Sequence, residues 1–298
     1  MGHEPVIGLA LGSGGARGWC HIGVLEELDR IGVRPGVIAG TSMGALVGVA
    51  WASGKLDALK QWVGELTPRR FLGLIDPRFK GGLVEAQEIT RMLADIGVPE
   101  RLEDLDFPFT AVATDMRTGR EIWFDEGPTY PAVRASVGIP GVMTPLWHEG
   151  MWLLDGGLVN PVPVSAVFAK RAEFIIAVNP NAKRPGRAWK DEAREDEAGS
   201  WLEMLPPAIS EALGLNGSEA GRDAPNYFTV LNASIDIMTE QIRRARFAGE
   251  PPHVVLDAAF DDLTVLELFR GDEAIAEGRR MVKDKEEEIR ELCDLHPR

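Results

Sequence analysis

Residues 37–52 constrain the fold of this chain more than any other stretch. An apolar run, Val37-Ile38-Ala39, ends at Gly40-Thr41-Ser42-Met43-Gly44, and an apolar helix pattern follows directly. This order predicts a buried strand, a sharp turn with Ser42 at its apex, and a buried helix. The glycines leave room for close strand–helix packing. A serine placed in this way, at the positive end of a helix, can act as a nucleophile on an ester carbonyl.

The same Gly-x-Ser-x-Gly pattern also occurs in ordinary turns, so other parts of the chain must support the chemistry. Residues 6–11 form a second apolar run, which predicts a strand. It is followed by Gly12-Ser13-Gly14-Gly15-Ala16-Arg17-Gly18 and by an amphipathic helix pattern that Gly32 ends. Alternating strands and helices predict an α/β fold, a three-layer α/β/α sandwich with a mainly parallel central sheet.

The loop over residues 12–18 has two functional interpretations. Backbone N–H groups in a glycine-rich loop can surround the oxyanion of ester hydrolysis or the phosphates of a nucleotide. The nucleotide-binding pattern is only approximate, because Ser13 stands where a strict G-x-G-x-x-G ending at Gly18 has glycine. The second strand also ends in the Ser42 turn, not in the acidic residue that binds a ribose. An ester hydrolase is therefore favoured over a nucleotide-binding oxidoreductase, and a catalytically idle regulator that keeps the fold is a third hypothesis.

A serine hydrolase also needs a base that accepts the serine proton. The chain contains five histidines, which are His3, His21, His148, His253 and His296. His253 lies late in the chain, before a predicted strand, and is one candidate for the base. Asp155 is the other, because it follows an apolar strand pattern and precedes Gly156-Gly157.

Taken together, the motifs resemble those of the patatin-like phospholipase family. The shared stretches are Gly14-Gly15-Ala16-Arg17-Gly18, Gly40-Thr41-Ser42-Met43-Gly44, Ala135-Ser136-Val137-Gly138-Ile139-Pro140 and Asp155-Gly156-Gly157. The resemblance covers roughly residues 5–180, and the later helix–strand–helix pattern is similar to that of small bacterial members. It implies hydrolysis of lipid acyl esters by a dyad, with Ser42 as nucleophile and Asp155 as base.

The resemblance also implies the other parts of the site. The oxyanion hole is assigned to Gly14, Gly15, Arg17 and Met43. The remaining motif glycines are Gly12, Gly18, Gly40, Gly44, Gly156 and Gly157. An ordinary aspartate has a pKa of about 3.9, too low to hold a serine proton, so Asp155 must be partly desolvated. We expect no cofactor and no metal ion, since the sequence shows no cluster of metal ligands.

Charge and composition limit the partners and the compartment. The formal net charge of −14 excludes nucleic acid and opposes docking on anionic lipid, so any membrane contact must use apolar side chains. No apolar run is long enough to span a bilayer, and no signal peptide is apparent. Two cysteines, Cys20 and Cys293, suit a reducing compartment. We expect a cytoplasmic protein that contacts a membrane at most peripherally, with a lipid or fatty-acyl ester as substrate.

The chain is expected to form one patatin-like domain over residues 5–298. A highly charged stretch and an apolar stretch predict a variable insertion at about 183–225, interpreted either as a short packed helix or as a lid. Residues 71–79 are interpreted as a loop, or alternatively as a flap lining an acyl-chain groove. A long helix is predicted over 227–247, with Met238 facing inward, and residues 263–292 are predicted to be largely helical.

Overall fold

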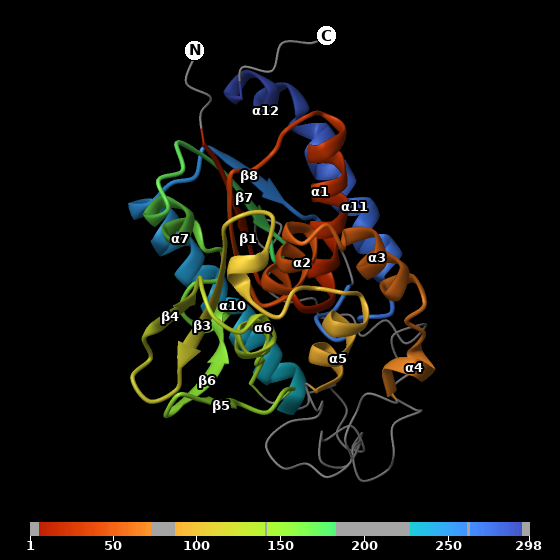
Figure 1. Cartoon of the computed structure of the whole chain (residues 1–298), viewed down its shortest axis with the longest axis vertical. Coiled ribbons are helices and arrows are strands. Elements are labelled where there is room, and N and C mark those ends of the chain that lie inside the picture. Colours follow the sequence, from red (N-terminus) through yellow and green to blue (C-terminus); the bar gives the residue numbers. More distant parts are fainter. Residues whose placement is uncertain (1–5, 73–86, 141, 183–226, 261–262, 294–298) are drawn as a thin grey trace, which may run out of the picture.

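The computed structural model describes residues 6–72, 87–140, 142–182, 227–260 and 263–293. One eight-stranded sheet runs through the molecule, with helices on both of its faces (Figure 1). The strands are β1 (Ile7–Leu11), β2 (Val37–Thr41), β3 (Phe109–Asp115), β4 (Glu121–Phe124), β5 (Leu146–His148), β6 (Met151–Asp155), β7 (Phe174–Asn179) and β8 (Val254–Asp257). Their order is β5-β6-β3-β2-β1-β7-β8, and β4 pairs with β3 off this path.

The sheet is mainly parallel, as the sequence predicts. β3, β2, β1, β7 and β8 pair in parallel, and β4, β5 and β6 add an antiparallel part at one edge. The α-helices are α1 (Cys20–Arg30), α2 (Met43–Ala52), α3 (Leu56–Gly64), α4 (Pro68–Leu72), α5 (Gln87–Asp95), α6 (Thr129–Ser136), α7 (Val164–Ala169), α10 (Tyr227–Gly249), α11 (Gly271–Asp284) and α12 (Glu286–Leu292). Short 3-10 turns are η1 (Gly15–Trp19), η2 (Leu102–Asp104) and η3 (Gly156–Leu158).

The core is divided by the sheet into two layers. Alternate residues of β1 contribute to each, so Leu9 and Leu11 pack with α1, α2 and α11, whereas Ala10 packs with α7. All five residues of β1 and all five of β2 are buried, because helices cover both faces of these strands. This explains why these strands read as continuous apolar runs and not as alternating patterns.

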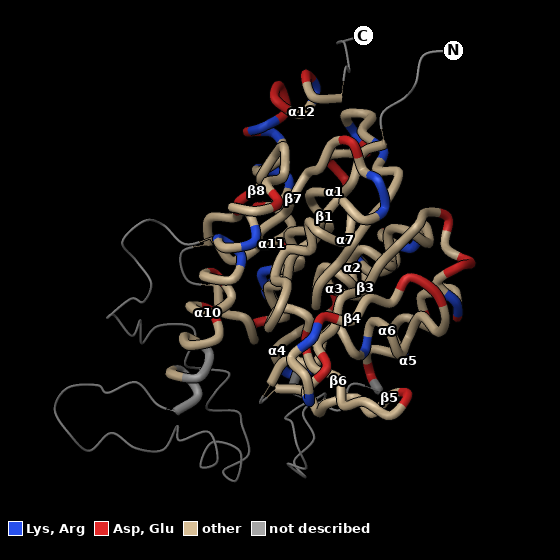
Figure 2. The backbone as a smooth tube through the Cα atoms, turned by 90° about the vertical axis from the view of Figure 1, so that its left-hand side faces the viewer, with Lys and Arg blue, Asp and Glu red and all other residues tan. Residues whose placement is uncertain are grey.

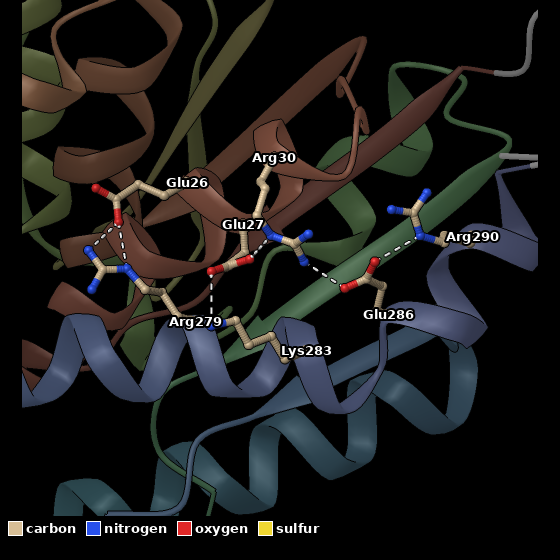
Figure 3. Close-up of polar contacts among 7 residues, drawn as sticks. All are labelled: Glu26, Glu27, Arg30, Arg279, Lys283, Glu286 and Arg290. Carbon is tan, nitrogen blue, oxygen red and sulfur yellow. Dashed lines mark hydrogen bonds and ion pairs between the residues drawn. The ribbon is translucent and has the colours of Figure 1, made fainter. Parts of the chain in front are cut away.

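The helix α11 packs closely against α1, and glycines make the close contact possible. A Cβ atom on Gly278 would lie 1.9 Å from the carbonyl oxygen of Cys20, and one on Gly23 would lie 2.0 Å from that of Ile275. Charged side chains line the same contact (Figure 3). Arg279 pairs with Glu26 at 2.6 Å, and Lys283 pairs with Glu27 at 3.5 Å. The helix that follows the glycine loop is thus held by a segment more than 200 residues later in the chain.

Residues 263–292 are largely helical as expected, but the helical part begins only at Gly271, and the carbonyl groups of residues 263, 265 and 268 accept hydrogen bonds from Arg17, Ala16 and Trp19. One sequence-based expectation requires correction. Met238 on α10 is 53% exposed instead of facing inward, and its neighbour Thr239 is buried. The predicted insertion at 183–225 and most of the 71–79 segment lie outside the described residues.

Within the part of the chain that the structure describes, no helix combines the length and the apolar character that crossing a membrane requires.

The contact between α1 and α11 predicts a stability effect at Gly278. The change Gly278→Ala places a methyl group against backbone, and overpacking of this kind lowers the free energy of unfolding by about 1–3 kcal/mol. The matched control is Gly64→Ala at the end of α3, where no described atom lies within 4 Å of the new Cβ. We expect this control to be neutral or slightly stabilising in urea unfolding. Equal midpoints for the two variants would contradict the analysis.

Candidate active site

The pairing of β3 brings the predicted nucleophile and base together. β2 runs parallel to β3 and pairs Thr41 with Val112, whereas β6 runs antiparallel and pairs Asp155 with Ala113. Because β4 occupies the other edge of β3 at both positions, β2 and β6 share one edge and meet at their carboxyl ends. Ser42 directly follows Thr41. Ser42 and Asp155 therefore lie next to each other, at the carboxyl ends of two strands that run in opposite directions.

Ser42 lies on a strained turn, as the sequence predicts. Its backbone φ is 56° and ψ is −122°, a conformation that non-glycine residues rarely adopt. A Cβ atom on Gly40 would lie 2.4 Å from the carbonyl oxygen of Gly44, and one on Gly44 would lie 2.1 Å from that of Leu11. Only glycine at both positions permits the strand and helix to approach this closely.

A second serine supports the turn. The backbone N–H of Ser42 donates to the hydroxyl oxygen of Ser136 at 2.8 Å, and that hydroxyl donates to the carbonyl oxygen of Val112 at 2.6 Å. Ser136 is fully buried on α6. Sequence reasoning recognised Ser136 as part of a motif but missed this role, because a hydrogen bond to a backbone N–H at position 42 has no signature in the sequence.

The carboxyl group of Asp155 is buried, and only one of its two oxygen atoms accepts a full hydrogen bond. Its Oδ1 accepts a hydrogen bond from the backbone N–H of Gly157 at 2.7 Å, whereas Oδ2 has no full hydrogen bond to any described residue. Burial raises the pKa of Asp155 from 3.8 to about 6, and the Ser42 hydroxyl and the Gly157 N–H pull it down by less. The Ser42 hydroxyl thus approaches the carboxylate without a complete hydrogen bond.

The backbone around Asp155 is fixed on both sides. Its N–H donates to the carbonyl oxygen of Gly138 at 3.0 Å, and its carbonyl oxygen accepts from the hydroxyl of Thr114 at 2.8 Å. A Cβ atom on Gly156 would lie 2.2 Å from the carbonyl oxygen of Val112. The chain therefore turns tightly at Gly156 and keeps Asp155 beside the end of β2.

The glycine loop contacts both halves of this pair. A Cβ atom on Gly18 would lie 2.4 Å from Cβ of Met43, and one on Gly157 would lie 3.1 Å from Cβ of Ser13. Gly12 anchors the start of the loop, with its N–H donating to the carbonyl oxygen of Val178 at 3.0 Å. The loop is thus a neighbour of the serine turn and of the aspartate turn.

Some backbone N–H groups of the glycine loop and of the turn after Ser42 have no acceptor in the described part of the chain. Among the described residues, the N–H groups of Gly14, Gly15 and Met43 donate no hydrogen bond. Met43 begins α2, and Gly15 begins η1 with a φ of 54°. Free N–H groups at the start of a helix and in a glycine loop are suited to bind an oxyanion.

Arg17, which the sequence assigned to the oxyanion hole, is engaged elsewhere in this geometry. Its guanidinium donates to the carbonyl oxygen of Leu263 at 2.8 Å and to Oδ1 of Asn181 at 3.0 Å, and it pairs with Asp236 at 3.2 Å. Its backbone N–H donates to Gly14 at 3.2 Å. Arg17 therefore ties the loop to α10 and to residue 263, and a direct part in binding an oxyanion stays a prediction.

Residues 263–268 form a strap along the glycine loop. Besides the bond from Arg17 to Leu263, the N–H of Ala16 donates to Val265 at 2.9 Å, and the indole N–H of Trp19 donates to Leu268 at 3.0 Å. A Cβ atom on Gly15 would lie 2.3 Å from the carbonyl oxygen of Val265. All the acceptors are backbone carbonyl groups, so the residue types of the strap gave no signal in the sequence.

His253 and His148 do not take part in this arrangement. The ring of His253 accepts a hydrogen bond from the N–H of Ile175, at the start of β7, and packs against Phe174. It therefore lies at the amino end of the parallel strands, whereas Ser42 lies at the carboxyl end. His148 packs against Phe124. His253 is thus wrongly placed to serve as a base for Ser42.

Neither cysteine has the properties of a nucleophile. Cys20 and Cys293 are free and buried, and burial raises the pKa of the Cys293 thiol to about 11 and that of Cys20 further. In the described part of the chain, no group of three His, Cys, Asp or Glu side chains is arranged to hold a metal ion.

Fold and site together define an α/β protein with a serine at a strained strand–turn–helix junction and a buried aspartate beside it. The family model of the patatin-like phospholipases matches residues 9–168. The chain belongs to this family, and the family supports an activity on lipids as a hydrolase.

Known proteins share different portions of the chain. An uncharacterized NTE family protein of Mycobacterium tuberculosis (strain ATCC 25618 / H37Rv) is 32% identical over an alignment of 327 residues, gaps included. The alignment covers 93% of this chain and 90% of that protein. The neuropathy target esterase sws of Drosophila melanogaster is 32% identical over 181 residues, covering 58% of this chain and 13% of that protein. The crystal structure of VipD from Legionella pneumophila matches 95% of this chain and 66% of that chain, with 12% identity and a TM-score of 0.45.

The buried His21 beneath the glycine loop predicts a pH-dependent stability. Its Nε2 lies 2.7 Å from the carbonyl oxygen of Gly12, so Nε2 carries the proton, and Nδ1 is buried without a partner among the described residues. Burial lowers the pKa of His21 from 6.5 to about 4. As the pH falls, His21 is protonated near pH 6.5 in the unfolded chain but only near pH 4 in the folded protein. The free energy of unfolding therefore decreases as the pH falls between these two values.

Comparison of the wild type with His21→Gln isolates this contribution. The glutamine amide can still donate to Gly12 but does not titrate. Between pH 7.5 and 4.5, we expect the wild type to lose about 2–3 kcal/mol more unfolding free energy than the variant, measured by urea denaturation. Parallel pH profiles for the two proteins would rule out this role of His21.

Proposed function

We propose that the protein hydrolyses acyl esters of lipids, as a phospholipase A, lysophospholipase or carboxylesterase, through a Ser42–Asp155 dyad. The observation that carries the proposal is the meeting of β2 and β6, which puts a strained serine beside a buried carboxyl group of raised pKa. Membership of the patatin-like phospholipase family supports the same chemistry. The nucleotide-binding alternative has no such support.

The first half of the reaction forms an acyl-enzyme. The Asp155 carboxylate takes the proton of the Ser42 hydroxyl while Oγ forms a bond to the ester carbonyl carbon. The negative charge that develops on the carbonyl oxygen is stabilised by the free N–H groups of Gly14, Gly15 and Met43. When the tetrahedral intermediate collapses, the bond to the leaving alcohol breaks and the proton passes from Asp155 to that alcohol.

The second half releases the fatty acid. Asp155 takes a proton from a water molecule, whose oxygen attacks the acyl carbon, and the same N–H groups stabilise the second oxyanion. The bond from the acyl carbon to Ser42 then breaks, and the proton returns to the serine. A base with a pKa near 6 accepts a proton in this cycle far more readily than an ordinary aspartate.

Removal of either member of the dyad tests the proposal. Ser42→Ala and Asp155→Asn are each expected to lower kcat for a p-nitrophenyl ester at least about 1,000-fold with an unchanged circular dichroism spectrum, because a nucleophile and its base act as a unit. A fluorophosphonate is expected to label Ser42 in the wild type, located by mass spectrometry. Full activity of Asp155→Asn would refute the dyad, and a labelled protein without turnover on any ester would favour an idle regulator.

The raised pKa of Asp155 predicts the pH profile. The base works only when ionised, so kcat/KM is expected to rise with pH, to reach half its plateau near pH 6 and to stay level above it. The control is the slow residual hydrolysis by Asp155→Asn, which should lack this transition. A profile with full activity at pH 4 would contradict the assignment of Asp155 as the base.

A further inference from the structure

Three short strands at one edge of the sheet expose large apolar side chains. The exposed fractions are 58% for Met116, 38% for Trp123, 56% for Trp147 and 49% for Trp152. These residues belong to β4, β5, β6 and the turn that follows β3. We call these four residues the aromatic face.

The strand register places all four on the same side of the sheet. Trp147 and Trp152 are direct partners in the β5–β6 pair, with ring centroids 5.1 Å apart. The N–H of Met116 donates to the carbonyl oxygen of Trp152 at 2.8 Å, which puts Met116 opposite Trp152. Trp123 is paired with Val112, four residues before Met116 and therefore on the same side.

The two sides of these strands differ in how they are covered. On the side opposite the aromatic face, Leu153 of β6 and Ala113 of β3 are fully buried against Ala135 of α6. Trp152, the neighbour of Leu153, is half exposed. Large apolar side chains are thus presented to the outside on one side only, and exposed clusters of this kind mark interaction surfaces.

Charges of both signs lie next to the aromatic face, although the chain as a whole carries −14. The carboxylate of Glu121 accepts a hydrogen bond from the indole N–H of Trp123 and pairs with Arg246. Arg117 and Arg120 lie exposed in the turn after β3, and neither forms a salt bridge with a described carboxylate. The nearby Asp115 carboxylate instead accepts hydrogen bonds from the backbone N–H of Arg117 and from Thr118. Figure 2 shows the tube at β5 mostly in tan, with acidic colour at its end. Glu149 lies in the hairpin turn that follows β5.

We propose that the aromatic face, together with Arg117 and Arg120, binds the surface of a zwitterionic phospholipid bilayer. Indole rings favour the boundary between headgroups and acyl chains, where the ring is in an apolar layer and its N–H is hydrated. Arginine side chains bind phosphate groups at short range. The overall charge of −14 repels an anionic bilayer, which makes a zwitterionic surface the matching partner.

The position of this surface suits a lipid hydrolase, and its role in turnover rests on the function proposed above. Trp152 precedes Asp155 by three residues on β6, which corresponds to about 10 Å along a strand. The side chain of Asp155 lies on the side of Leu153, opposite the aromatic face, so a bilayer bound at the tryptophans lies near the end of β6 but across the sheet from Asp155. Lipid from the bound surface would pass around this edge of the sheet to reach the site.

Vesicle binding tests the surface without catalysis. The full chain carrying Ser42→Ala is mixed with phosphatidylcholine vesicles, and binding is measured by co-sedimentation. We expect the added changes Trp147→Ala and Trp152→Ala to weaken binding at least tenfold, and Arg117→Gln with Arg120→Gln to weaken it several-fold. The matched control is Phe168→Ala, because Phe168 is a 39% exposed aromatic residue on α7, far from β5 (Figure 1). It should leave binding unchanged.

Activity measurements separate this inference from the proposed function. With Ser42 intact, the tryptophan variant should hydrolyse a water-soluble p-nitrophenyl ester like the wild type but lose activity on vesicles. Vesicle binding without hydrolysis of any lipid would support the surface and refute the proposed function. Unaltered binding by the tryptophan variant would overturn the inference. A wild-type dimer that the same changes dissociate, without vesicle binding, would also overturn it and make the face a contact between copies.

Discussion

The register along one edge of β3 is the constraint on which the candidate site depends. Val112 and Ala113 are consecutive, and they fix the ends of β2 and β6 respectively. A slip of one residue in either pairing would shift a strand by about 3.3 Å and turn its side chains to the other side of the sheet. The carbonyl oxygen of Val112 also accepts the hydroxyl of Ser136, so one position of β3 serves both the serine turn and the aspartate turn.

The centre of the molecule holds several features that oppose folding. Ser42 is strained, Oδ2 of Asp155 is buried without a full hydrogen bond, and Nδ1 of His21 is buried without a partner in the described chain. Such features persist only where the surrounding structure compensates for them. Here the compensation comes from the close packing of α11 on α1 and from the strap at residues 263–268. A stable exterior thus holds a reactive and locally unfavourable interior.

The sequence predicts the parts of the site that depend on local patterns. The strained turn at Ser42 follows from an apolar run, two glycines and a helix pattern, and the α/β fold follows from the order of such units. It does not predict the partners of Arg17, since Asp236 lies 219 residues away and only the folded chain brings the two together. The sequence does not predict the irregular strap at residues 263–268 either. Its hydrogen bonds to the glycine loop are accepted by backbone carbonyl groups, which every residue type has. Its mixture of apolar and charged residues also resembles that of a helix.

The strap also has a consequence for how the protein is made. Its hydrogen bonds join the glycine loop to carbonyl groups 246 and 249 residues later in the chain. A growing polypeptide that has already emerged past Ser42 and Asp155 has yet to synthesise the segment that positions this loop. Synthesis proceeds from the amino end, so the loop cannot acquire its final form until translation has passed residue 268. The candidate site would consequently take its final form only after all eight described strands of the sheet have been synthesised.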